Sequence, residues 1–322
     1  MKKIIAMALA LCMLLGCSAA LAEGTTYSVG VIQLVQHVAL DAATQGFQDA
    51  LTLLVEEHGD KVEFNVQNAS GDAATCATIA NGFASDEVDL IMANATPALQ
   101  AAVAATADIP ILATSITVYD VALDIPADEW QGFTGFNVSG TSDLAPLDQQ
   151  AQIIKELFPD AQNIGLIYCS AEPNSLYQVT TIGKHLEELG YQTTMYPFAD
   201  SNDLASVTQV ACDGADVLYI PTDNTAASYV ETVYNVVQPS GTPVVAGEEG
   251  ICAGCGVATL TIDYYDLGYA TGKMAYEVLV NGADVSTMPI EFAPIFTKKY
   301  NPVIAAELGV EIPEGYEAIV TE

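Results

Sequence analysis

Residues 28–33 read Ser-Val-Gly-Val-Ile-Gln, and residues 163–168, Asn-Ile-Gly-Leu-Ile-Tyr, repeat the same pattern in the second half of the chain. Such uninterrupted apolar runs are typical of strands in a parallel sheet that is covered on both faces. Further runs repeat in the same order and with roughly the same spacing: 89–96 resembles 216–222, and 109–113 resembles 242–246. The chain therefore consists of two halves with one common pattern.

Amphipathic helices are predicted between these strands. In the segment 40–57, apolar residues recur at helical spacing and form one stripe, and the segment 175–189 occupies the same slot in the second half. Alternating strands and helices predict an α/β fold with two doubly wound parallel-sheet lobes. The similarity of the halves reflects either an internal repeat or the general pattern of βαβ units, and both explanations lead to two lobes.

Three crossings between the lobes are expected. The segment 133–142 is rich in glycine and small polar residues and is predicted to be the first crossing and hinge. A second crossing is expected near 259–263 and a third near 288–294. The predicted boundaries are 27–138 with about 263–290 for lobe one, and 139–262 with about 291–322 for lobe two.

The N-terminus has the features of an export signal. Two lysines precede an uncharged run that is too short to span a bilayer but suits a signal peptide. The run ends in Leu-Leu-Gly-Cys, which resembles a bacterial lipobox, so residues 1–16 would be removed, Cys17 would carry the lipid and 17–26 would be a tether. In the alternative, ordinary cleavage after Ala22 releases the protein. In both cases the mature protein is expected outside the cytoplasm.

The composition excludes several classes of partner. The chain has 41 acidic residues, eight lysines and no arginine, which give a formal net charge of −33. Such a surface repels nucleic acid and anionic lipid headgroups, and we expect neither as a ligand. Without arginine, an anionic group of a ligand must be held without a bidentate guanidinium.

Five cysteines follow the signal region: Cys76, Cys169, Cys212, Cys252 and Cys255. Because five is odd, at least one thiol stays free. The last two form a Cys-x-x-Cys motif, but no second pair of ligands completes a zinc site. Their glycine-rich flanks do not indicate the helix N-terminus that a thioredoxin-like pair requires. Free thiols, a structural disulfide, and redox or metal chemistry stay open for this pair.

Motifs of common enzyme classes are absent from the sequence, which lacks GxGxxG, GxxxxGK[ST], GxSxG and HExxH. His58 and His185 lie near polar helix ends, whereas His37 follows the first strand, where it could contact a ligand. Glu248 and Glu249 are adjacent, so in an extended segment their side chains point in opposite directions. We therefore expect a protein that is not an enzyme and has no cofactor or metal.

Small polar loops follow the predicted strands, at the edge where open α/β sheets bind ligands. The candidate ligand-binding residues in these loops are Gln36, His37, Thr96, Pro97, Thr114, Ser115, Asn174, Ser175, Thr222, Asp223, Asn224 and Glu248. Thr96 followed by Pro97 suggests an N-cap and a first helical residue. Each small polar residue could serve only as a helix cap, but six such loops favour one joint site.

Several of these segments together resemble one known family. They are 30–41, 89–97 and 108–110 in the first half, and 221–225, 246–250 and 262–268 in the second. The family is the ABC-transporter substrate-binding proteins of the tryptophan/tyrosine uptake type. The resemblance implies a type I periplasmic-binding-protein fold that closes on a ligand, and delivery to a permease with a cytoplasmic ATPase. The chain departs from the family pattern at Val38, where proline is frequent, and at the Cys-x-x-Cys motif.

The expected function is that of a monomeric solute-binding lipoprotein of an ABC importer, with an aromatic or large apolar amino acid as ligand. A tethered ligand-sensing receptor of the same fold is the alternative. An extracytoplasmic enzyme would need a nucleophile and base that the sequence does not show.

The sequence also predicts a pose for the ligand. Its carboxylate is expected at Thr96, Thr114 and Ser115, beside the positive end of the helix that begins at Pro97. Its ammonium is expected at Asp223 and Glu248. The residues predicted to complete the polar shell are Asn174, Ser175 and Asn224. The alternative for Asp223 is that it only caps the following helix.

Overall fold

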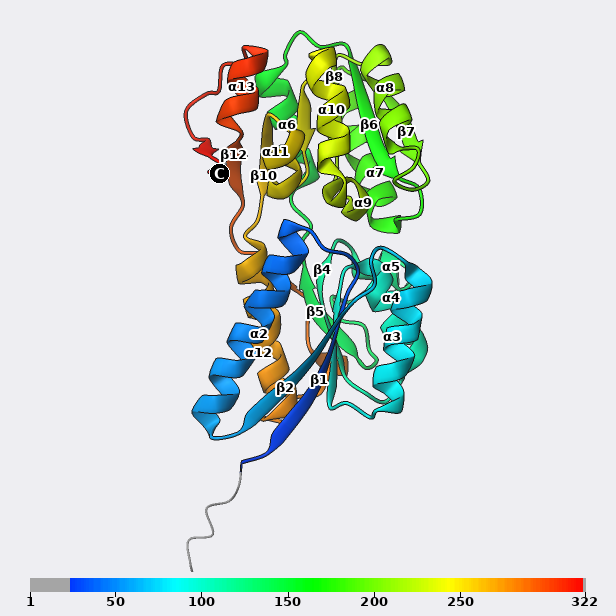
Figure 1. Cartoon of the computed structure of the whole chain (residues 1–322), viewed down its shortest axis with the longest axis vertical. Helices are drawn as coiled ribbons and strands as arrows, with labels where there is room; N and C mark the ends of the chain where they lie inside the picture. The colour runs from blue at the N-terminus through cyan, green and yellow to red at the C-terminus, as the bar shows by residue number, and fades with distance from the viewer. Residues whose placement is uncertain (1–23, 321–322) are drawn as a thin grey trace, which may run out of the picture.

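Two sheets, one in each lobe, form the framework of the molecule, and the lobes lie end to end along its long axis (Figure 1). This computed structural model describes residues 24–320. The predicted signal peptide and Cys17 lie outside the described residues.

Lobe one contains a six-stranded sheet with the order β11-β5-β4-β3-β1-β2, in which all adjacent strands are parallel. Its strands are β1 (Thr26–Gln33), β2 (Lys61–Asn68), β3 (Leu90–Asn94), β4 (Ile111–Ile116), β5 (Val138–Ser142) and β11 (Glu291–Phe292). Its helices are α2 (Val38–His58), α3 (Ala73–Ser85), α4 (Thr96–Ala105), α5 (Tyr119–Ala122), α12 (Tyr264–Leu279) and the 3₁₀ helix η1 (Val285–Thr287).

Lobe two contains a seven-stranded sheet with the order β13-β12-β10-β9-β8-β6-β7, in which β12 is antiparallel to β10. Its strands are β6 (Asn163–Cys169), β7 (Gln192–Phe198), β8 (Val217–Ile220), β9 (Val244–Ala246), β10 (Ala258–Thr261), β12 (Thr297–Tyr300) and β13 (Glu317–Ala318). Its helices are α6 (Leu147–Leu157), α7 (Pro173–Glu188), α8 (Leu204–Gly214), α9 (Asn224–Ser228), α10 (Val230–Ser240), α11 (Glu249–Cys255) and α13 (Pro302–Leu308).

The two sheets share one topology. The order β2-β1-β3-β4-β5 in lobe one corresponds to β7-β6-β8-β9-β10 in lobe two. The three pairs of similar segments in the sequence are β1 with β6, β3 with β8 and β4 with β9, and the members of each pair occupy equivalent places in their sheets. The prediction of two doubly wound lobes is confirmed.

Helices cover both faces of each sheet, which explains why the strands are apolar throughout. In lobe one, Ile91 of β3 packs with the helices α3 and α4, whereas Leu90 and Met92 pack with α2 and α12 on the other face. Lobe two is built in the same way, with α6 and α7 on one face and α8, α10 and α11 on the other. Each lobe therefore has its own two-sided core.

The crossings differ in part from the predicted boundaries. Residues 138–142 form strand β5, which pairs with β4, so the first crossing follows Ser142. This strand consists of small residues that resemble a loop in sequence, yet it is fully buried between β4 and β11. Likewise β11 belongs to the sheet of lobe one, which places the third crossing between Phe292 and Thr297. The second crossing lies between Thr261 and Tyr264, where it was expected.

Helices α2 and α12 pack closely on the outer face of lobe one, because glycines line their contact. A Cβ atom on Gly268 would lie 1.9 Å from the carbonyl oxygen of Ala43, and one on Gly46 would lie 2.1 Å from that of Tyr265. Real Cβ atoms do not approach backbone this closely, so only glycine permits this helix separation. Because α12 begins directly after the second crossing, this contact connects the crossing to the body of lobe one.

Candidate functional site

A cavity lies between the lobes, at the carboxyl ends of their parallel strands. About 290 Å³ of space is free of protein atoms there, and this space is partly open to solvent. Its lining comes from both lobes and from two crossings and consists of His37, Leu40, Ser115, Thr117, Asp143, Asn174, Thr222, Asp223, Asn224, Ala227, Glu248 and Tyr264. Open α/β sheets bind ligands at this edge.

Seven of the twelve residues predicted from the sequence line this cavity: His37, Ser115, Asn174, Thr222, Asp223, Asn224 and Glu248. Gln36 and Pro97 instead line a wider groove along the same cleft. Thr96, Thr114 and Ser175 are buried but do not contribute to the lining. The structure therefore brings together most of the predicted lobe-two residues and fewer of those in lobe one.

Two threonines that were predicted to bind the ligand carboxylate, Thr96 and Thr114, do not line the cavity. The Thr114 hydroxyl shares a hydrogen bond of 3.1 Å with the Thr141 hydroxyl in the interior of lobe one. Thr96 is the first residue of α4 rather than its N-cap, and the capping position belongs to Ala95, which has a φ of 87° and gives no side-chain hydrogen bond. The interpretation of Thr96 as an N-cap is wrong by one residue.

The two lobe-two acids are helix caps that also face the cavity. Asp223 caps α9 and accepts hydrogen bonds from the backbone N–H groups of Ala226 at 2.8 Å and Cys169 at 2.6 Å. Glu248 caps α11 and accepts from the N–H groups of Gly250 and Ile251. Both oxygens of each carboxylate therefore already have backbone partners. Asp223 therefore caps α9, as the alternative interpretation predicts, and it also lies in the wall of the cavity.

Glu172 was not predicted from the sequence, although it lies in the loop between β6 and α7, two residues before the predicted Asn174. Its buried carboxylate accepts hydrogen bonds from the backbone N–H groups of Asn224 at 3.0 Å and Thr225 at 2.9 Å, and from both of their side chains. Burial, and then the charge of Glu172, raise the pKa of Asp223 well above its ordinary value. Glu172 thus adds a second negative charge at the start of α9.

Asp143 lies directly after β5 in the first crossing and was also not predicted. Its Oδ2 accepts a hydrogen bond of 3.0 Å from the hydroxyl of Tyr264, which begins α12 after the second crossing. Its Oδ1 is buried without a hydrogen-bond partner. Burial raises the pKa of this carboxyl to about 6, although the bond from Tyr264 opposes the shift. Asp143 therefore presents a free acceptor at the junction of two crossings.

Two further polar atoms of the cavity wall are buried without partners: Ser115 Oγ and Asn174 Oδ1. Ser115 has a φ of 57°, in the left-handed region, where the pairing of β4 with β5 shifts its register. Such a conformation is costly for a residue with a side chain and is often found at functional sites. The Asn174 amide nitrogen donates to Glu172 and to the Thr222 carbonyl, so its oxygen remains for a ligand.

Hydrogen bonds join the lobes beside the cavity. His37 Nε2 of lobe one lies 3.3 Å from Asn224 Oδ1 of lobe two. The Asn224 amide nitrogen donates to Glu172 at 2.7 Å, so its oxygen accepts and the imidazole donates. Burial lowers the pKa of His37, which keeps the ring neutral at pH 7. Gln178 Nε2 donates to Thr117 Oγ1 at 3.4 Å as a second bridge.

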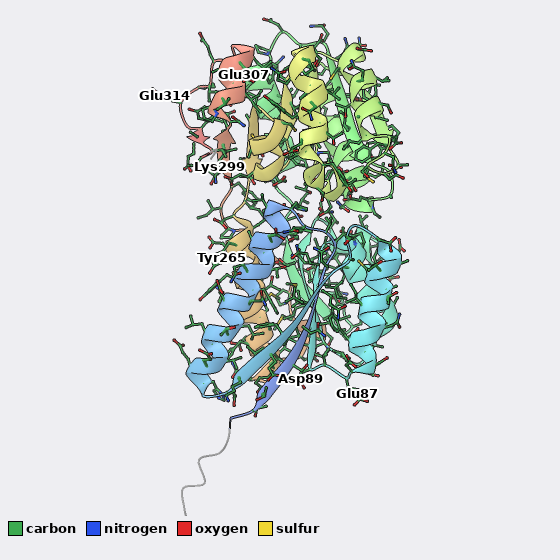
Figure 2. All side chains as sticks on the ribbon, in the orientation of Figure 1. Glu87, Asp89, Tyr265, Lys299, Glu307 and Glu314 are labelled. Atoms are coloured by element: carbon green, nitrogen blue, oxygen red, sulfur yellow. The ribbon has the colours of Figure 1, made fainter. Side chains whose placement is uncertain are left out.

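Positive side chains are absent from the described cavity wall. Lys299 of β12 forms an ion pair of 2.6 Å with Glu249 at the edge of lobe two (Figure 2). Lys298 pairs with Glu156, and Lys155 lies over the ring of Tyr191. The site is therefore formed by carboxylates, amides and hydroxyls, with no cation among its lining residues.

Comparison with known proteins identifies the family. The family model described as ABC transporter substrate binding protein matches residues 28–321. This chain belongs to that family. A tyrosine-binding protein of Clostridioides difficile strain R20291 is 37% identical over 263 residues, which cover 82% of this chain and 75% of that protein. Substrate-binding proteins of ABC transporters act outside the cytoplasm and are not enzymes.

Two solved structures of about equal sequence identity differ in how well they match this substrate-binding protein. An ABC domain from Streptococcus pneumoniae in complex with L-Trp is 34% identical, covers 92% of this chain and all of its own, and has a TM-score of 0.85. A ligand-free, open substrate-binding protein from Clostridium difficile is 35% identical with the same coverage, but its TM-score is 0.68. Since identity and coverage are nearly the same, the difference indicates that the arrangement of the lobes here is more similar to that in the L-Trp complex than to that in the open structure.

The Cys-x-x-Cys motif of this substrate-binding protein lies in the second half of a helix and not at its N-terminus, in agreement with the interpretation of its glycine-rich flanks. Helix α11 follows β9 directly and contains both Cys252 and Cys255 as buried, free thiols. Burial raises the pKa of both thiols strongly, so neither is poised as a thiolate. The pair packs in the core of lobe two between α11 and its neighbours.

Within residues 24–320, no helix is both long and apolar enough to cross a membrane.

The buried carboxyls predict that the ligand-free protein is more stable in mild acid than at alkaline pH. An Asp or Glu carboxyl titrates at about pH 4 in an unfolded chain, whereas in the folded protein Asp143 titrates at about 6 and Glu248 at about 7. Between these values the folded protein binds more protons, so the free energy of unfolding falls as pH rises. Thermal unfolding at about pH 5 and pH 8 measures this. Equal or higher stability at the alkaline pH would contradict it.

Proposed function

We propose that this substrate-binding protein is the extracytoplasmic lipoprotein of an ABC importer and that it closes on an aromatic amino acid. The observation that carries the ligand class is the set of three unpartnered polar atoms, Ser115 Oγ, Asp143 Oδ1 and Asn174 Oδ1, in the wall of one cavity between the lobes. Buried polar groups are normally hydrogen-bonded. These atoms therefore fit a small ligand with polar groups of its own.

The proposed pose places the ammonium of the amino acid at Asp143 Oδ1, because this is the carboxylate oxygen of the cavity wall without a donor. The carboxylate lies toward the Thr117 hydroxyl and the start of α2, whose N-cap, His37, gives no side-chain hydrogen bond. Free N–H groups at a helix start favour negative charge. The side chain then contacts the apolar parts of Leu40, Ala227 and Tyr264.

The aromatic class is supported by the relatives. One of them is a tyrosine-binding protein and another contains L-Trp, and both are more than 30% identical to this chain over most of its length.

Calorimetric titration with L-tyrosine and L-tryptophan tests the ligand class, with L-glutamate and ribose as controls. Mass spectrometry of ligand released from the denatured protein identifies what the cell supplies. Saturable binding of an aromatic amino acid, with a smaller radius of gyration in solution scattering, is the expected result. Exclusive binding of a sugar or of an acidic amino acid would contradict the proposal.

The tether is tested at Cys17. In the proposed lipoprotein, Cys17→Ala prevents lipidation, so the membrane-bound form is expected to be replaced by precursor or released protein. Two or more acyl chains are needed for stable anchoring, and a lipobox cysteine carries at least two. Membrane fractionation measures the change, and Cys212→Ala is the matched control. Membrane association that survives Cys17→Ala would exclude this anchor.

A further inference from the structure

Four buried carboxylates surround the cavity or support its wall: Asp143 comes from the first crossing, and Glu172, Asp223 and Glu248 come from lobe two. No lysine lies among the lining residues, and the sequence contains no arginine. The field inside the cavity is therefore negative. A ligand with a positive charge gains from each of these groups that is ionised, whereas an anionic group has no charged partner. Burial raises the pKa of Asp223 and Glu248, so their share of the charge is reduced at neutral pH, and Asp143, with a pKa of about 6, is mostly ionised there.

The three unpartnered polar atoms of the cavity wall can all accept hydrogen bonds, which also suits a cationic donor. Asp143 Oδ1 can only accept when ionised, and the Asn174 oxygen can only accept, because its amide nitrogen is directed to Glu172 and the Thr222 carbonyl. Ser115 Oγ can accept as well as donate. A primary ammonium has three N–H donors, one for each of these three atoms.

A ligand carboxylate would find weaker partners. The hydroxyl of Thr117 accepts a hydrogen bond from Gln178 and keeps its own O–H to donate, and the other donors are backbone N–H groups at the start of α2. These groups are neutral, and three carboxylates of the wall stand in the same small cavity. The attraction that a carboxylate gains is offset by repulsion from like charges, and no guanidinium counters it.

We infer that the site recognises a primary ammonium as its obligatory ligand group and tolerates loss of the carboxylate, so that aromatic primary amines are ligands as well as aromatic amino acids. This inference rests on the proposed function for the aromatic class. In this inference, Asp143, Asn174 and Ser115 bind the ammonium group and make the site select for amines.

The test compares ligands that differ in one charged group. Calorimetry on the whole protein at neutral pH and low salt uses L-tyrosine, tyramine and 3-(4-hydroxyphenyl)propionate, with the corresponding indole series. Tyramine is expected to bind within about tenfold of L-tyrosine, and the propionate at least about 100-fold more weakly. A loss of more than about tenfold for tyramine, or a propionate that binds as tightly as tyramine, would overturn the inference.

The outcomes also separate this inference from the proposed function. If no compound of either series binds, the aromatic class is wrong and the inference falls with it. If the amines bind and the amino acids do not, the amine inference holds and the amino-acid proposal fails. In the variant Asp143→Asn, tyramine is expected to lose at least about 100-fold in affinity, whereas Asp148→Asn on the exposed side of α6 leaves it unchanged. Unchanged tyramine binding in Asp143→Asn would overturn the role of Asp143.

Discussion

Replacing Asp143 by asparagine is expected to weaken the binding of L-tyrosine or L-tryptophan by about 2–5 kcal/mol, which is roughly 30-fold to several thousand-fold. The ammonium of the ligand would remain buried without its charged partner. Asparagine has nearly the same size, and its oxygen can still accept the hydrogen bond from Tyr264, so the fold should be retained. Calorimetry measures the dissociation constant, and thermal unfolding checks the stability of the variant.

Asp223→Asn is the informative comparison, because both oxygens of Asp223 already accept backbone hydrogen bonds. Its main effect is expected on stability, at about 1 kcal/mol for the lost cap. The exposed Asp148 again provides the control for removing a charge. The assignment of the ammonium would be wrong if Asp223→Asn abolished binding while Asp143→Asn bound as tightly as the parent.

Gly268→Ala is expected to lower the free energy of unfolding by about 3 kcal/mol or more. The added methyl group would lie 1.9 Å from the carbonyl oxygen of Ala43 and 2.6 Å from its carbon, both in the backbone of α2. A flexible side chain could turn away from such a contact, but here the two helices must move apart. Urea unfolding followed by circular dichroism measures the loss.

Gly82→Ala is the matched control for this substitution. Gly82 is an exposed residue inside α3, and no atom lies within 4 Å of the position that a Cβ would take. Alanine has a higher helix propensity, so this variant should gain about 0.5–1 kcal/mol. A Gly268→Ala variant that is as stable as Gly82→Ala would show that α2 and α12 tolerate a wider separation.

The fold was predictable because its signals are local. Apolar runs such as 28–33 and 163–168 identify buried parallel strands, and the repeated order identifies the two lobes. Strand β5 lacked such a signal: its residues are small and polar, and only the neighbouring strands β4 and β11 make it part of a sheet. Strands that depend on tertiary pairing leave little trace in the sequence.

The candidate site was predictable where polar residues lie within a few residues of the end of a predicted strand. His37, Asn174 and Asp223 are at such positions, and the structure places them in the cavity wall. Asp143 follows β5, which was not predicted to be a strand, and Tyr264 begins α12 after the second crossing. The paths of these two crossings bring the side chains within 3.0 Å of each other. The role of Ser115 depends on a left-handed backbone at a register shift, which the sequence does not encode in any short pattern.

The hydrogen bond between Tyr264 and Asp143 has a consequence for how such proteins diverge. This hydrogen bond places a polar contact of the cavity at the first crossing and at the start of α12, next to the second crossing. Apolar lining residues also come from the lobes, with Leu40 in one lobe and Ala227 in the other. Substitutions at these two positions can therefore change the preferred cargo without altering the hinge. A duplicated gene could acquire a new ligand through its lobes and retain the inherited mechanics of closure.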